Sequence, residues 1–84
     1  MEQNLLLEIL AEECAEVIQI KSKTVRFGMY NLNPITGKSN RELLVQEIGD
    51  VMAMIRLVQE SGLFTKDELE GCVEKKLKKI ERWS

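Results

Sequence analysis

The chain has 84 residues, of which 44% are hydrophobic and 31% are charged, and it contains one proline and no histidine. This length and composition predict one folded, cytoplasmic domain that covers residues 1–84. The net charge of −2 offers no broad positive surface for stable binding of nucleic acid or membranes, and charged residues interrupt every apolar stretch short of a membrane span. Without histidine, Ser/His and Cys/His catalytic arrangements and histidine zinc sites are excluded.

The first predicted helix covers residues 3–26 and ends before Gly28, which suits the left-handed position after a helix. Glu13 and Glu16 interrupt its apolar stretch and, being three residues apart, share one side of the helix. At about 100° per residue, Glu13 falls near the centre of the apolar face and Glu16 falls at its edge. Glu12 lies farther round, near enough to Glu16 to be a candidate fifth carboxylate.

The segment of residues 27–38 is long for a connection between two packed helices, and loops of this length are often functional. We expect Arg26 and Lys38, at its two ends, to reach phosphate groups of a ligand. Its aromatic and amide side chains, Tyr30, Asn31 and Asn33, offer contacts to a nucleotide base. Alternatively, its apolar residues, Phe27, Leu32 and Ile35, only cover the end of the helix pair.

The second predicted helix begins after Ser39, where Ser39-Asn40-Arg41-Glu42 has the pattern of a capping box, and it ends near Ser61. Two further carboxylates, Glu47 and Asp50, lie three residues apart within its apolar stretch. Glu47 falls on the flank of the apolar stripe, and Asp50 is the next position outward. If the first two helices face each other, the four carboxylates converge.

Ionised carboxylates in an apolar interior repel one another and lose hydration, so such a cluster requires a cation. Mg²⁺ prefers oxygen ligands and retains several waters, and Mn²⁺ accepts the same ligands. We therefore predict a metal site formed by Glu13, Glu16, Glu47 and Asp50, with Glu12 as an additional candidate. The alternative is that these carboxylates are ordinary solvated residues on helix surfaces.

The third predicted helix starts with another capping box, Thr65-Lys66-Asp67-Glu68, and runs to about Trp83. Lys76 lies within its apolar stripe, Lys79 borders the stripe and Arg82 lies on the outer flank. We expect these three cations to bind phosphate groups. The alternatives are that Lys76 extends its ammonium into solvent or pairs with a carboxylate, and that Arg82 is a surface charge.

The predicted fold class is all-α, with three helices in each protomer. A single core in so short a chain seldom supplies more than about 3 to 5 kcal/mol of stability, so association with further copies is expected. We predict a homodimer or homotetramer in which the first two helices of neighbouring copies form a four-helix bundle core. The two cysteines, Cys14 and Cys72, are expected to be small buried apolar residues.

The two acidic motifs resemble a known signature. Glu12-Glu13-Cys14-Ala15-Glu16 followed by Glu47-Ile48-Gly49-Asp50 is similar to the ExxE…ExxD pattern of the MazG-like all-α nucleoside triphosphate pyrophosphohydrolases. The resemblance covers the first two helices and extends to the basic third helix. It implies that Glu13, Glu16, Glu47 and Asp50 hold Mg²⁺ and perform the chemistry, while Lys76, Lys79 and Arg82 lie near the phosphates.

The activity implied by this resemblance is Mg²⁺-dependent cleavage of a (deoxy)nucleoside triphosphate between the α and β phosphates, giving a nucleoside monophosphate and pyrophosphate. The resemblance leaves open which nucleobase and sugar the enzyme would prefer. It also leaves open which carboxylate would accept the proton of the attacking water. The alternative is a non-catalytic helical module that mediates dimerisation or senses nucleotides.

Overall fold

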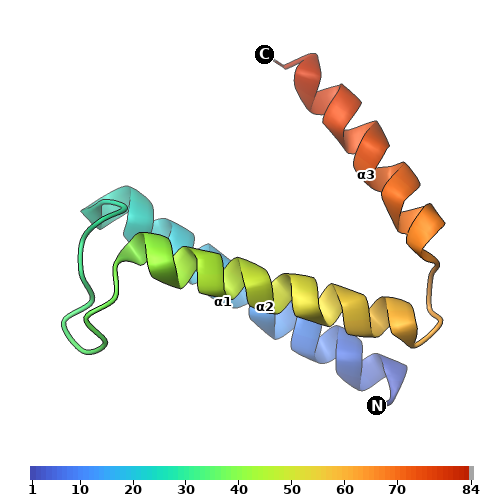
Figure 1. Ribbon diagram of the computed structural model, residues 1–84, viewed down its shortest axis with the longest axis horizontal. Coiled ribbons are helices and arrows are strands. Elements are labelled where there is room, and N and C mark those ends of the chain that lie inside the picture. Colours follow the sequence, from blue (N-terminus) through green and yellow to red (C-terminus); the bar gives the residue numbers. More distant parts are fainter. Residues whose placement is uncertain (84) are drawn as a thin grey trace.

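The computed structural model describes residues 1–83 and consists of three helices joined by two loops (Figure 1). Helix α1 spans Gln3–Phe27, α2 spans Asn40–Glu60 and α3 spans Lys66–Glu81. The predicted all-α class and three helices are therefore confirmed, with α3 ending slightly earlier than expected. Within the described residues, no helix is both long enough and apolar enough to cross a membrane.

Local side-chain contacts explain where each helix starts. The Thr65 hydroxyl accepts a bond from the Glu68 N–H, and the Glu68 side chain accepts one from the Thr65 N–H, so the predicted capping box of α3 is complete. At α2, the Ser39 hydroxyl caps the Glu42 N–H, but the Glu42 carboxylate accepts from that hydroxyl instead of from the Ser39 N–H. The cap of α1 is the Glu2 carboxylate, which the sequence analysis did not anticipate.

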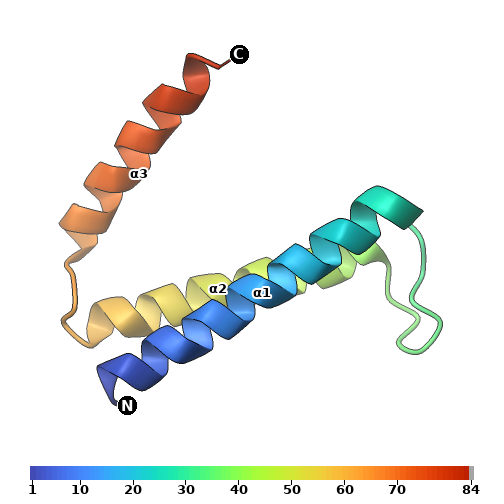
Figure 2. The ribbon, with the colours of Figure 1, turned by 180° about the vertical axis from the view of Figure 1, so that it is seen from behind.

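The segment between α1 and α2 is ordered by backbone and amide contacts. The side chain of Asn33 accepts bonds from the N–H groups of Ile35 and Thr36, which closes a tight turn at the tip. The buried amide of Asn40 donates to the carbonyl oxygen of Gly28, which ties the start of α2 to the end of α1 at 2.8 Å. These contacts hold α1 and α2 in an antiparallel hairpin (Figures 1 and 2).

Apolar residues fill the seam between α1 and α2. Leu6, Met54 and Val58 form the buried core, and Ile9, Leu10 and Phe64 pack against it. This core joins the N-terminal half of α1 to the C-terminal half of α2, and Ile20 is buried farther along α1. The carboxylate motifs lie between these two buried regions, so the hairpin fixes their positions from both sides.

Helix α3 stands apart from the hairpin, which it leaves at a steep angle after α2 (Figures 1 and 2). None of its described residues is buried. The molecule is accordingly thin and open, with extents of 41 × 38 × 14 Å. Its radius of gyration is 15.5 Å, whereas a compact domain of this length has a value of about 12 Å.

The expectation that both cysteines are buried is wrong, because Cys14 and Cys72 are exposed and free. Only one face of α1 is covered by α2, and Cys14 lies outside that face. Cys72 belongs to the apolar stripe of α3, in which no described residue is buried. Helical periodicity identified the apolar sides of these helices, but it did not show what covers them.

Candidate metal centre

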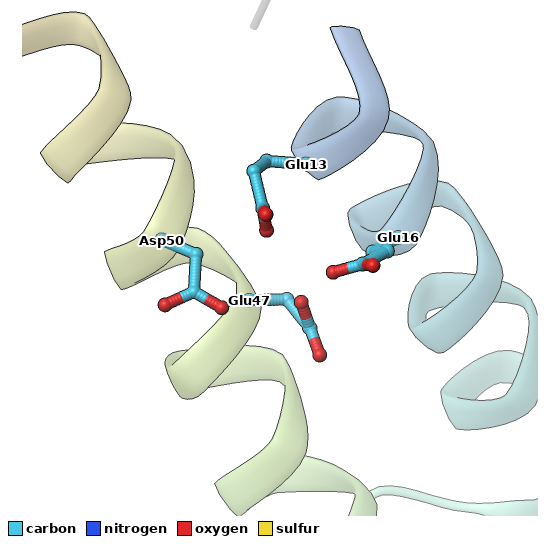
Figure 3. Close-up of side chains that lie close together, drawn as sticks. All are labelled: Glu13, Glu16, Glu47 and Asp50. Atoms are coloured by element: carbon cyan, nitrogen blue, oxygen red, sulfur yellow. The ribbon is translucent and has the colours of Figure 1, made fainter. Parts of the chain in front are cut away.

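Four carboxylates meet in the middle of the hairpin (Figure 3). Glu13 and Glu16 extend from α1, and Glu47 and Asp50 extend from α2 toward them. One oxygen from each side chain can be chosen so that all four oxygens lie within 4.8 Å of one another. The predicted convergence of the two acidic motifs is therefore present. Spacing of three residues on each antiparallel helix produces it, since each motif presents two carboxylates to the seam.

The cluster has an inner and an outer half. Glu13 and Glu47 are half-buried, whereas Glu16 and Asp50 are exposed, as their positions on the helical wheel predicted. One oxygen of each inner carboxylate is buried without a hydrogen bond: the Oε2 atoms of Glu13 and Glu47 are shielded from solvent and have no hydrogen-bond partner. Buried carboxylate oxygens are normally paired, so these two atoms suit a cationic or hydrogen-bond-donating partner.

Protonation of the inner pair responds to this environment. Burial raises the pKa of Glu13 above its ordinary value of 4.5, and the adjacent Glu16 and the charges of Asp50 and Glu12 act in the same direction. The pKa of Glu47 is also raised, first by a hydrogen bond with Glu16, then by burial and by the neighbouring negative charges. Two ionised carboxylates have no proton to share, so a bond to Glu16 forms only when one partner is protonated.

The donor set and its spacing suit hard divalent cations. Carboxylate oxygens bound to opposite sides of one Mg²⁺ lie about 4.2 Å apart, so the observed limit of 4.8 Å is slightly wide for one ion that touches all four groups. A small inward rotation of the side chains, or division of the ligands between two ions, satisfies this requirement. The exposed outer pair leaves one side of the cluster open to water and ligands.

The other predicted residues are distributed around the molecule. Glu12 is exposed and does not join the four converging carboxylates, although its charge acts on Glu13. Arg26 stacks on the Phe27 ring at 5.4 Å, near the end of α1. Lys38 lines a separate depression at the start of α2, together with Arg41.

The three cations of α3 are carried away from the carboxylate cluster of their own chain (Figure 1). The Lys76 ammonium lies over the ring of Trp83 at 4.8 Å, and Lys79 and Arg82 are exposed. The structure thus brings together the four predicted acidic residues within one chain, but it does not bring the predicted cations of α3 to them.

One cation near the cluster was missed by the sequence analysis. Lys23 lines a depression of about 290 Å³ whose other walls include Glu16 and Glu47. Gln19 lies between Glu16 and Lys23 on the same flank of α1 and lines the same depression. The signal was present in the sequence, because residues 16, 19 and 23 share one flank of a helix. The cations predicted to bind phosphate lie instead at the two ends of the α1–α2 loop and on α3.

Comparison with known proteins adds no identification: no family model matches the chain, and no curated protein or solved structure is significantly similar to it.

Proposed function

We propose that this chain is a Mg²⁺-dependent nucleotide pyrophosphohydrolase, which cleaves (deoxy)nucleoside triphosphates between the α and β phosphates. The observation that carries this proposal is the convergence of four carboxylates from two antiparallel helices, including two buried oxygens without partners. The resemblance to the ExxE…ExxD signature concerns the same four residues. Mn²⁺, which accepts the same ligands, is the expected substitute metal.

The reaction places clear demands on the site. A water attacks the α phosphorus, the bond from this phosphorus to the bridging oxygen breaks, pyrophosphate leaves and the proton of the water passes to a carboxylate. Bound divalent cations would neutralise phosphate charge and make a coordinated water more acidic. In this proposal the four carboxylates of the cluster hold the ions, and one of them accepts the proton.

The test is pyrophosphate release by the purified protein from each common NTP and dNTP, with Mg²⁺ and with EDTA. We expect Glu47→Gln to lower metal-dependent turnover by at least about 100-fold, because it removes an inner ligand charge. Glu8→Gln is the matched control, since Glu8 is exposed on α1 outside the cluster. Absence of metal-dependent release from every nucleotide, or a fully active Glu47→Gln variant, contradicts the proposal.

The same experiment separates an enzyme from a non-catalytic module. A dimerisation or nucleotide-sensing domain with this fold would bind metal or nucleotide without releasing pyrophosphate. Binding of Mg²⁺ by the wild-type protein, measured by its melting temperature, combined with no turnover on any nucleotide, would assign the chain to that class.

We further propose that the chain works as a homodimer or homotetramer in which hairpins pair into a four-helix core. Its accessible surface is 6736 Å², whereas a compact monomer of this mass exposes about 5,100 Å². The excess is larger than the roughly 800 Å² that each partner buries in a stable interface. Lys76, Lys79 and Arg82 retain a phosphate-binding role in this proposal if α3 of one copy reaches the hairpin of another.

A further inference from the structure

The depression next to the carboxylate cluster combines groups of opposite charge. Its volume is about 290 Å³, and it continues the α1–α2 seam from the cluster toward the loop. Glu16 and Glu47 are the half of the cluster nearer that loop (Figure 3). Both line the depression. The remaining lining residues are Gln19, Ile20, Lys23 and Leu43. A ligand bound at the carboxylates therefore has space on this side.

The opposite direction along the seam is filled. Beyond Glu13, toward the start of α1, the seam contains Leu10 and the buried core around Leu6 and Met54. An anionic ligand chain that begins at the carboxylates thus meets apolar side chains on one side and the depression on the other. The second direction offers polar groups that line an open space beside the cluster.

Lys23 is the cation of this depression, and its ammonium is available. Within the described part of the chain, it forms no ion pair and no side-chain hydrogen bond. It lies seven residues after Glu16, about 10 Å farther along the axis of α1, with Gln19 between them. Along this flank of α1, the carboxylate of Glu16, the amide of Gln19 and the ammonium of Lys23 therefore follow one another in that order.

This order matches a polyphosphate whose first phosphate is held at the metal ligands. The phosphates beyond it carry negative charge, which Glu16 and Glu47 repel unless a cation faces it. An ammonium supplies three donors that suit phosphate oxygens in several orientations, and the amide of Gln19 supplies neutral donors. Charge-assisted bonds of this kind are stronger than bonds between neutral groups.

We propose that this depression binds the β and γ phosphates of the substrate, which leave as pyrophosphate, with Lys23 as their cation and Gln19 as an additional donor. This inference rests on the proposed function, because it assigns a place to the leaving group of that reaction. It makes Lys23 a binding residue supplied by the same chain as the carboxylates, independent of where α3 packs.

Calorimetric titration of inorganic pyrophosphate into the protein with saturating Mg²⁺ tests this proposal. We expect Lys23→Gln to weaken pyrophosphate binding about tenfold or more, and Lys23→Arg to retain most of it. Lys21→Gln is the matched control, because it removes the same charge from an exposed position on α1 that does not line the depression. Its pyrophosphate affinity should stay within about twofold of wild type. In turnover, Lys23→Gln should raise KM more than it lowers kcat.

Each contrary outcome is informative. The inference is overturned if Lys23→Gln binds pyrophosphate as tightly as the wild type does. It is also overturned if Lys23→Gln loses affinity for a nucleoside monophosphate instead, and that result places the nucleoside in the depression. If the wild type hydrolyses nucleotides and Lys23→Gln does so equally well, the inference fails and the proposed hydrolysis stands. If the wild type neither binds pyrophosphate nor shows metal-dependent turnover, both fail.

Discussion

The inner carboxylates, Glu13 and Glu47, differ from the outer pair in how protonation changes their energy. Their buried oxygens lack partners, so ionisation leaves negative charge in a poorly solvated position. Both have a raised pKa, which means that the folded chain holds protons more tightly at these positions than the unfolded chain does. A divalent cation removes this penalty by pairing with the ionised forms. Proton and metal binding should therefore compete.

This competition predicts how stability depends on pH. A carboxyl group whose pKa is raised by folding stabilises the fold fully below its ordinary pKa, and this contribution is lost as pH rises through the raised value. Without metal, the melting temperature should therefore fall as pH increases above 4.5, the ordinary value for both residues. With Mg²⁺, the fall should be smaller, and the stabilisation by Mg²⁺ should grow with pH.

Thermal melts from pH 4.5 to 8, with EDTA or with Mg²⁺, measure this effect. At a free Mg²⁺ concentration of 100 times Kd the expected stabilisation is about 2.7 kcal/mol. The Glu13→Gln/Glu47→Gln double variant should lose both the downward trend and most of the response to Mg²⁺. An equal Mg²⁺ response in wild type and double variant would show that the ion binds elsewhere.

The helices differ in what holds them. α1 and α2 are fixed by the seam between them and by the Asn40 bond to Gly28. α3 depends on its own capping box and on Phe64, which attaches the preceding turn to the core. Isolated helices of this length are marginally stable in water. We therefore expect α3 to open locally without loss of the hairpin.

A pair of cap variants tests this difference. Thr65→Ala removes the hydroxyl that accepts from the Glu68 N–H and should destabilise α3 by about 1 kcal/mol. Amide exchange should then become faster in residues 66–81 alone, with little change in the melting of the hairpin. Ser39→Ala, the matched change at α2, should lower the melting temperature of the hairpin, because Ser39 is buried there.

If Thr65→Ala lowered the protection from amide exchange equally in α3 and in the hairpin, local opening of α3 would be contradicted. Such a result would show instead that α3 packs against a hairpin in the assembled protein. The measurement is hydrogen exchange followed by mass spectrometry, which assigns protection to individual segments.

The helices and the four clustered carboxylates could be predicted from the sequence because both depend on local geometry. Caps such as Thr65 mark a helix start, and the spacing of Glu13 to Glu16 fixes their common side. The exposure of Cys72 depends on what covers α3, which no local pattern records. The common flank of Glu16 and Lys23 could be read from the sequence, but the position of Lys23 beside Glu47 depends on how the hairpin packs.

At the scale of the molecule, the hairpin has two different faces. Helical geometry places Leu7, Ile18 and Val25 on one side of the seam and Glu16 and the depression on the other. These three apolar residues are substantially exposed, Ile18 by 62%. On α2, Val45 and Met52 extend the same apolar face and are also exposed. Exposed apolar residues grouped in this way are typical of an interface. A second copy can cover this face while the carboxylates stay open.

The interface can therefore be tested without altering the site. Ile18→Glu adds a charge to the apolar face, and burying that charge between two hairpins is unfavourable. In size-exclusion chromatography with light scattering, we expect this variant to have the mass of one chain and the wild type to have the mass of two or four chains. Ala15→Glu adds the same charge to an exposed position on the outer side of α1, and it should keep the wild-type mass.

A wild type with the mass of one chain, or an Ile18→Glu variant that remains assembled, would show that copies do not associate through this face. Retention of Mg²⁺-dependent stabilisation in monomeric Ile18→Glu would then show that one hairpin suffices to hold the metal.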